Sequence, residues 1–180
     1  MASDSLPASH SSLAISSPET EQRYLWFQII PDTGALLPIS QLAEVLTIPV
    51  GQITPIPQLP AWVMGVNNWR GEVIWMVDLA HLLGFTPWYQ QGMMTTHTAI
   101  VLRVPSTGVL ETKVVNQTIG LVVHRVTAIE RCDRNQLQPP SSGIVTPQLI
   151  PFLCGYLLKS NGERLAVLND EVIVETIYKS

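Results

Sequence analysis

The chain has 180 residues and a mass of 19.9 kDa, enough for one domain or two small ones that need no disulfide or metal to fold. Apolar residues make up 46% and charged residues 13%, so we expect some apolar surface to be kept for partners. The net charge is −4 with 10 Lys and Arg residues. A protein that binds nucleic-acid phosphates or an anionic membrane surface needs a stripe of basic residues, and the sequence contains none. The sequence therefore argues against both functions.

The N-terminal residues predict a tail outside the folded domain. Residues 1–22 are rich in Ser and have no apolar period, which is typical of a disordered segment, so we expect the domain to occupy residues 23–180. The segment has neither the basic start nor the apolar run of a secretory signal, and no apolar run reaches the length of a spanning helix. Cys132 and Cys154 form no CxxC pair, which favours free thiols in a cytoplasmic protein, with a disulfide as the alternative.

The first part of the domain predicts a β-hairpin followed by irregular chain. Residues 24–30 and 35–39 are strand-forming runs on either side of the turn residues 31–34. Apolar residues at 42, 45 and 46 fit one helical turn or a bent strand. Four prolines between 49 and 60 exclude a helix or a central strand there.

A second hairpin and a short helix follow in residues 62–84. Two apolar runs flank the turn sequence NNWRG at 67–71, whose glycine can adopt positive φ. Asp78 is placed to cap a helix over 79–83, and Gly84 to end it. The remaining elements are a loop over 86–97, strands over 99–104 and 117–123 around a loose loop at 105–116, an irregular stretch over 139–151, and a last hairpin over 155–168.

A weak internal repeat relates the two later hairpins. The sequence WVMG at 62–65 matches FLCG at 152–155, and Gly71-Glu72 with Asp78 matches Gly162-Glu163 with Asn169 after one inserted residue. Reuse of turn residues by unrelated hairpins is the alternative. A true repeat predicts two similar small β-modules packed together.

Residue patterns for catalysis are not found in the sequence. The histidines at 10, 81, 97 and 124 share no metal-ligand spacing, and no nucleophile-elbow, P-loop or dinucleotide motif is present. Asp78 and Glu72 are interpreted as a helix cap and a turn residue rather than an acid–base pair. We therefore expect no enzyme, no catalytic residues, no cofactor and no metal site.

Tryptophans carry the strongest functional signal. Trp62, Trp69 and Trp75 fall within 14 residues, with Arg70 at the hairpin turn. Trp and Arg commonly anchor protein interfaces. We expect Trp62 and Trp75 to lie in the core, whereas Trp69 and Arg70 at the turn are harder to bury and favour an interface.

The string PAWVMGVNNWRGEVIWMVDL at 60–79, followed by LLG at 82–84, resembles the signature of the CheW-like domain family. Residues 23–39, Glu44-Val45, the strand IGLVV at 119–123 and FLCG at 152–155 also resemble that family. The resemblance spans about residues 22–170. It implies an all-β fold of two intertwined five-stranded SH3-like β-barrels with short helices.

The resemblance also implies a function. CheW-like proteins are adaptors that couple methyl-accepting chemoreceptors to the regulatory domain of a CheA-type histidine kinase, and they are cytoplasmic and recruited to receptor arrays. Carried over by motif, Asn68 and Arg70 mark the signalling turn, with Trp69 enlarging its contact surface, and Glu44 is a kinase-contact position. Val122 and Val123 are expected near the groove that receives the receptor's helical tip.

Departures from the family pattern leave alternatives open. Trp69 replaces the usual Leu, His124 replaces a common acidic residue, and the final D-L reads Asn169-Asp170. The segment EVIVETI at 171–177 is β-branched, so helix and strand are both open there. The second functional hypothesis is an SH3-like binding module that serves another complex, or that regulates or competes for the kinase without bridging to receptors. Which motility system the protein serves, flagellar, twitching or phototaxis, stays open.

Overall fold

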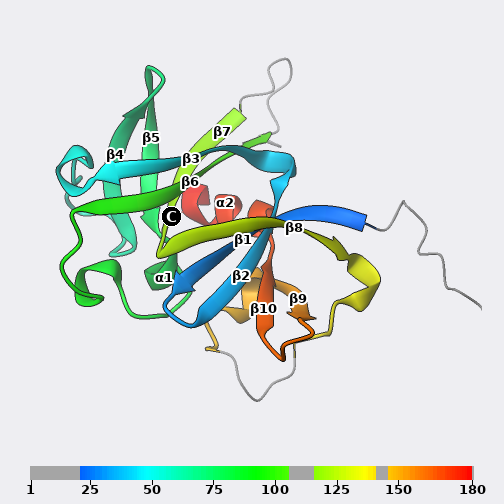
Figure 1. The fold of residues 1–180 in the computed structure, drawn as a ribbon. Coiled ribbons are helices and arrows are strands. Elements are labelled where there is room, and N and C mark those ends of the chain that lie inside the picture. The colour runs from blue at the N-terminus through cyan, green and yellow to red at the C-terminus, as the bar shows by residue number, and fades with distance from the viewer. Residues whose placement is uncertain (1–20, 106–115, 141–145, 180) are drawn as a thin grey trace, which may run out of the picture.

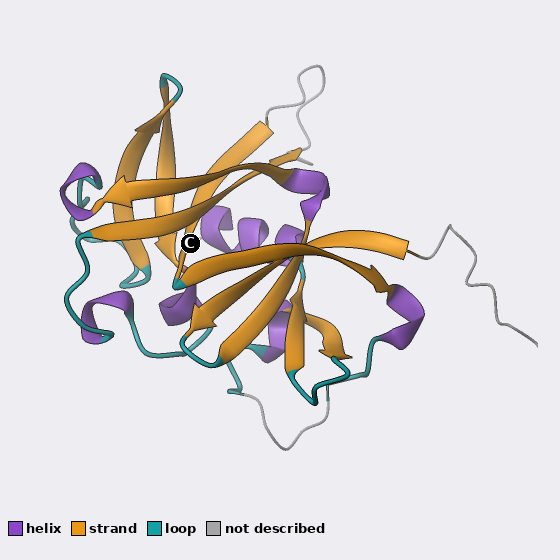
Figure 2. Cartoon of the chain, in the orientation of Figure 1, coloured by secondary structure: helices purple, strands orange, loops and turns teal. Residues whose placement is uncertain are grey.

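The computed structural model describes residues 21–105, 116–140 and 146–179. Ten strands form two five-stranded sheets, and each sheet curls into a small barrel (Figure 1). Sheet A has the strand order β8-β1-β2-β10-β9, and sheet B has the order β3-β6-β7-β5-β4. Strands dominate the cartoon in Figure 2, as expected for an all-β protein.

Sheet A is built from both ends of the described chain. Its strands are β1 (Glu21–Ile30), β2 (Thr33–Pro38), β8 (Arg125–Asp133), β9 (Leu153–Leu158) and β10 (Arg164–Leu168). β1 begins two residues before the expected start at Arg23, because Glu21 and Gln22 pair with Asp133 and Cys132 of β8. The rest of the expected tail lies outside the described residues.

Sheet B is built from the middle of the chain. Its strands are β3 (Leu42–Pro49), β4 (Val63–Trp69), β5 (Glu72–Asp78), β6 (Thr96–Pro105) and β7 (Asn116–Val123). The ambiguous residues 42–46 therefore form a strand, since β3 pairs with β6 along its length. The two sheets thus interleave in sequence, as the resemblance implied.

Helical segments connect and cover the sheets. The α-helices are α1 (Leu79–Leu82) and α2 (Asp170–Lys179), and single 3-10 turns are η1 (Ile39–Gln41), η2 (Val50–Gln52), η3 (Trp88–Gln90), η4 (Arg134–Gln136) and η5 (Ile150–Phe152). Residues 171–177, for which the sequence allowed either a helix or a strand, lie in helix α2. Asn169 Oδ1 accepts the backbone N–H of Val172 at 3.1 Å, so the start of the helix is capped despite its β-branched sequence.

The internal repeat is confirmed by geometry. Taken in order across each sheet, strands β8, β1, β2, β10 and β9 of sheet A correspond to strands β3, β6, β7, β5 and β4 of sheet B. Each sheet contains one parallel pair, β2 with β10 in sheet A and β5 with β7 in sheet B. Asp78 N–H donates to the Trp62 carbonyl at 2.9 Å, and its counterpart Asn169 N–H donates to the Phe152 carbonyl at 2.8 Å. The two hairpins are therefore the same structural unit used twice.

The interior is divided into three clusters by the alternation of side chains along the strands. A core shared by the two sheets takes Phe27 of β1, Ile100 of β6 and Ile173 of α2, whereas Ala99 and Val101 point into barrel B. The interior of barrel A holds Tyr24, Leu36, Cys132, Leu157, Leu165 and Val167. Because β1, β6 and α2 all contribute to the shared core, the barrels are packed as one unit.

Candidate functional site: a tryptophan cluster at the β4–β5 hairpin

The turn between β4 and β5 presents Arg70 at its tip. Arg70 and Gly71 both have positive φ, 52° and 85°, and Trp69 pairs with Glu72 on either side of them. This is the two-residue turn whose twist matches antiparallel strands. The Gly71 N–H donates to Asn68 Oδ1 at 3.1 Å, so the Asn68 side chain fixes the turn.

Trp69 is buried, which makes the expectation of an exposed tryptophan at the turn wrong. Its side chain is only 6% exposed and lies in the interior of barrel B with Ile74 and Met76. Its indole Nε1–H donates to Glu44 Oε2 of β3 at 2.8 Å. Because β3 and β4 are the two outer strands of sheet B, this hydrogen bond joins opposite edges of the sheet.

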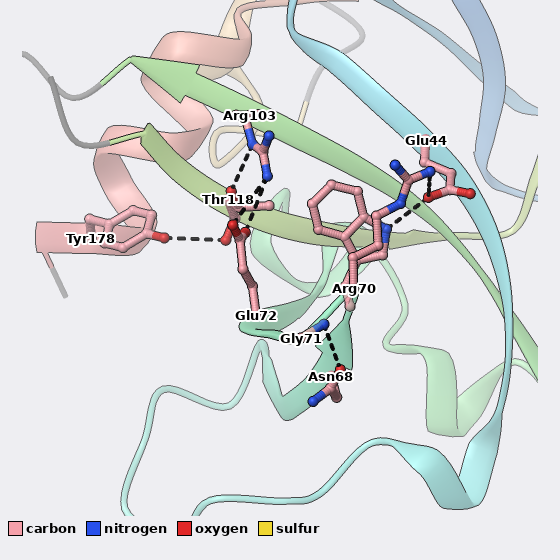
Figure 3. Close-up of polar contacts among 9 residues, drawn as sticks. Glu44, Asn68, Arg70, Gly71, Glu72, Arg103, Thr118 and Tyr178 are labelled. Atoms are coloured by element: carbon pink, nitrogen blue, oxygen red, sulfur yellow. Dashed lines mark hydrogen bonds and ion pairs between the residues drawn. The ribbon is translucent and has the colours of Figure 1, made fainter.

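Glu44 receives two donors on one oxygen atom. The same Oε2 that accepts the indole also pairs with the Arg70 guanidinium at 3.0 Å, as Figure 3 shows for Glu44 and Arg70. The Arg70 side chain is 69% exposed, against 34% for Glu44. The Arg70–Glu44 ion pair is therefore a surface contact, and its carboxylate is also held by the partly buried hydrogen bond from Trp69.

A second guanidinium lies against the same tryptophan. The Arg70 and Arg103 guanidinium carbons are each 5.2 Å from the centre of the Trp69 ring. Arg103 also pairs with Glu72 at 3.2 Å and donates to Thr118 Oγ1 at 3.4 Å (Figure 3). A groove of about 500 Å³ lies beside these side chains, lined by residues 40–43 with Trp69, Arg70, Arg103 and Pro105.

Barrel A carries the counterpart of this cluster. Lys159, just after β9, pairs with Glu130 of β8 at 2.7 Å and lies 3.7 Å above the centre of the Trp26 ring. β8 and β9 are the outer strands of sheet A, so the same kind of contact joins its edges. Sequence reasoning missed this second cluster, although the internal repeat places residue 159 near the position of Arg70.

The predicted partner-binding residues fall into two places. Glu44, Asn68, Trp69 and Arg70 come together at one end of β5, whereas Val122 pairs with Asp78 at the other end, six residues along the strand. Val122 and Val123 are each 4% exposed, one inside barrel B and the other in the shared core. They therefore offer little surface of their own.

Asp78 caps two segments near these valines, which confirms its expected capping role. Its Oδ1 accepts the His81 N–H at 3.2 Å and its Oδ2 accepts the Trp88 N–H at 2.8 Å. Burial raises the pKa of this carboxyl, against the opposing effect of the two backbone donors. His97 lies in the same small cavity, edge-on to Trp88 with ring centres 4.8 Å apart.

The buried His97 ring gives a pH-dependent stability. Neither ring nitrogen has a hydrogen-bond partner among the described residues, and burial lowers the pKa of His97 below its ordinary 6.5. Between pH 6.5 and the lower pKa of His97 in the folded protein, the unfolded chain binds more protons than the folded one. The free energy of unfolding therefore falls as the pH drops through this range. The raised pKa of Asp78 has the opposite effect. As the pH falls from the pKa of Asp78 in the folded protein toward 3.8, the folded protein binds more protons than the unfolded chain, so the free energy of unfolding rises.

We expect His97→Phe to remove the loss of stability as the pH falls below about 6.5, because phenylalanine keeps the edge-on ring contact and cannot titrate. Urea unfolding of both proteins at a series of pH values from about 7.5 to 5 measures this. His81→Phe is the control, since His81 is less buried. Parallel pH profiles for wild type and His97→Phe would contradict the assignment.

Over the part of the chain that the structure describes, no three His, Cys, Asp or Glu side chains are placed to hold a metal ion. Cys132 and Cys154 are both free thiols, so the alternative of a disulfide between them is wrong. Among the described helices, none is long and apolar enough to span a membrane.

Comparisons with known proteins agree with this architecture. Residues 23–177 match the model of the CheW-like domain. The scaffolding protein TtCheW from Thermoanaerobacter tengcongensis superposes with a TM-score of 0.64 at 23% sequence identity, over 82% of this chain and 88% of that one. Protein FrzA from Myxococcus xanthus is 36% identical over 63 residues, 35% of this chain and 38% of that protein.

The FrzA match spans well under half of either protein, and the likeness to TtCheW concerns the fold. The family match covers nearly all of the described chain, and it includes every strand of both sheets except the first two residues of β1. The chain therefore belongs to the CheW-like domain family.

Proposed function

We propose that this chain is an adaptor that couples methyl-accepting chemoreceptors to a CheA-type histidine kinase in chemotaxis or a related motility system. The observation that carries the proposal is the cluster of Glu44, Trp69 and Arg70, in which a partly buried hydrogen bond supports an exposed ion pair at a hairpin tip. A pre-ordered, exposed Arg beside a groove is a typical anchor of a protein interface.

The kinase regulatory domain binds this tip. Glu44 orients Arg70 and Asn68 fixes the turn, so these three residues form one surface, which the buried Trp69 supports from beneath. The receptor tip binds in the groove between the barrels near Val122 and Val123. Because both valines are buried, they shape that groove from beneath rather than make the contact.

The adaptor works by holding receptor and kinase in a fixed relation, at arrays of receptors in the membrane. A receptor movement then changes kinase activity through differential contacts in two states of the assembly. Such coupling requires only about 1–3 kcal/mol between the states.

Binding of the purified chain to the regulatory domain of its co-encoded kinase tests the proposal, with and without a receptor-tip fragment. We expect a Kd of about 1 µM or tighter for wild type, and a loss of roughly tenfold in Glu44→Ala and in Arg70→Ala, since each removes one side of the oriented pair. The receptor fragment should strengthen the wild-type complex.

Lys159→Ala is the matched control, because it removes the corresponding cation from barrel A. Binding to the kinase domain with no effect of the receptor fragment would favour a regulator that competes for the kinase without bridging. No binding to either partner would refute the adaptor function and leave only the fold.

A further inference from the structure

The two partners of Glu44 differ in how freely they can leave it. The Trp69 indole N–H is enclosed in barrel B, in a residue 6% exposed, and it donates to Oε2 at 2.8 Å. The Arg70 side chain is 69% exposed and meets the same oxygen at 3.0 Å. One oxygen therefore holds a buried donor and a surface donor at the same time.

Physical chemistry decides which of the two contacts breaks first. An exposed ion pair contributes little net stability, because water solvates both charges when they separate. The indole N–H belongs to a residue that is only 6% exposed, so water replaces a lost acceptor less readily there than at the exposed Arg70 guanidinium. Glu44 thus stays with Trp69, and Arg70 is the member free to exchange its carboxylate for another.

Arg103 supplies a second cation beside Arg70. Both guanidinium carbons lie 5.2 Å from the centre of the Trp69 ring, and both side chains line the groove of about 500 Å³ next to residues 40–43. Arg103 pairs with Glu72 and Thr118 through its Nη2 and Nε atoms. A guanidinium has five N–H donors, so both arginines keep donors for a further carboxylate.

We propose that Trp69 is a specificity-determining positioning residue: because its indole N–H stays with Glu44 when Arg70 leaves, Arg70 and Arg103 can together receive a carboxylate side chain of the kinase regulatory domain in this groove. The inference rests on the proposed function for the identity of the partner. It goes beyond that function because it requires an acidic side chain on the kinase domain and the indole N–H of Trp69 in this chain. Two guanidiniums can hold one carboxylate by several charge-assisted hydrogen bonds.

The first experiment follows the Trp69 indole N–H by NMR in the full chain without any partner. Trp69→Phe identifies its signal by deleting it. In Arg70→Ala we expect the signal to keep its position and its slow exchange with solvent, because Glu44 stays in place. In Glu44→Ala the signal should shift and exchange faster. Fast exchange in Arg70→Ala would overturn the proposal, since Glu44 would then depend on Arg70.

The second experiment measures the Kd for the kinase regulatory domain at two NaCl concentrations. Arg70→Ala, Arg103→Ala and the double variant should weaken binding and flatten its salt dependence, whereas Lys159→Ala should change neither. Trp69→Phe should weaken binding roughly twofold to fivefold, because Glu44 then has no second partner when Arg70 leaves it. Trp69→Phe should keep the wild-type salt dependence, because both guanidiniums remain, whereas a variant that fails to fold would lose binding at both salt concentrations.

The outcomes separate this inference from the proposed function. If wild type binds the kinase domain but the arginine variants keep its salt dependence, the adaptor function stands and the carboxylate exchange is wrong. The role of Trp69 is wrong if Trp69→Phe binds the kinase domain as tightly as wild type. If wild type does not bind the kinase domain at all, the proposed function and the proposed occupant of the groove both fall.

Discussion

Gly65→Ala is expected to destabilise the protein by about 3 kcal/mol or more, because two separate costs add. Gly65 has a φ of +142°, which L-residues rarely adopt, and a Cβ there would lie 2.1 Å from the Thr54 carbonyl oxygen. That carbonyl cannot withdraw easily, since it accepts the Val66 N–H at 2.9 Å and the Thr54 N–H donates back to Val66 at 2.8 Å. Urea unfolding measured by tryptophan fluorescence gives the free energy of unfolding.

Two other glycines provide the matched controls for Gly65. Gly71 also has positive φ, +85°, but a Cβ there would meet nothing within 4 Å, so Gly71→Ala should lose only about 1 kcal/mol. Gly155 is the counterpart of Gly65 in barrel A, with a Cβ 2.7 Å from the Gln138 carbonyl, and Gly155→Ala should fall between them. Equal losses at residues 65 and 71 would show that the close approach to Thr54 costs nothing.

Asp78→Ala is expected to lower the free energy of unfolding by about 2–4 kcal/mol, because one buried carboxylate satisfies two backbone donors. The side chain is 2% exposed and accepts from His81 N–H and Trp88 N–H. Removing it leaves both N–H groups without an acceptor and releases η3 from α1. Urea unfolding measures the loss, and faster amide exchange at Trp88 locates it.

The counterpart position in barrel A offers the comparison for Asp78. The Asn169 side chain accepts the Val172 N–H, so Asn169→Ala should cost about 1 kcal/mol, the usual value for a lost N-cap. A loss at Asp78 no larger than the loss at Asn169 would contradict the double role of the Asp78 carboxylate.

Local signals predicted much of the fold. The turn at 67–71 contains the glycine and the flanking apolar runs of a tight hairpin, and Asp78 and Gly84 bracket α1 as capping residues do. The matching glycines at 65 and 155 indicated the repeat, since each ends the same short apolar pattern. Each of these features depends on residues close together in the chain, where sequence patterns are informative.

Elements that depend on distant partners were missed or left open. β8 (Arg125–Asp133) was not expected as a strand, because it is an outer strand with exposed residues on both faces and has no clear alternation. The burial of Trp69 depends on Glu44, 25 residues away, and nothing near the turn reports that contact. Likewise, α2 needs the Asn169 cap and the shared core to make a helix of β-branched residues.

The order in which the chain leaves the ribosome acts differently on the two barrels. Every strand of sheet B lies between Leu42 and Val123, so its pairings are available while the last third of the chain is still being made. In sheet A, the β1–β2 hairpin is synthesised first but its neighbours β8 and β10 arrive last. Because segments made early can fold first during synthesis, we expect barrel B to form before the strands of barrel A are complete.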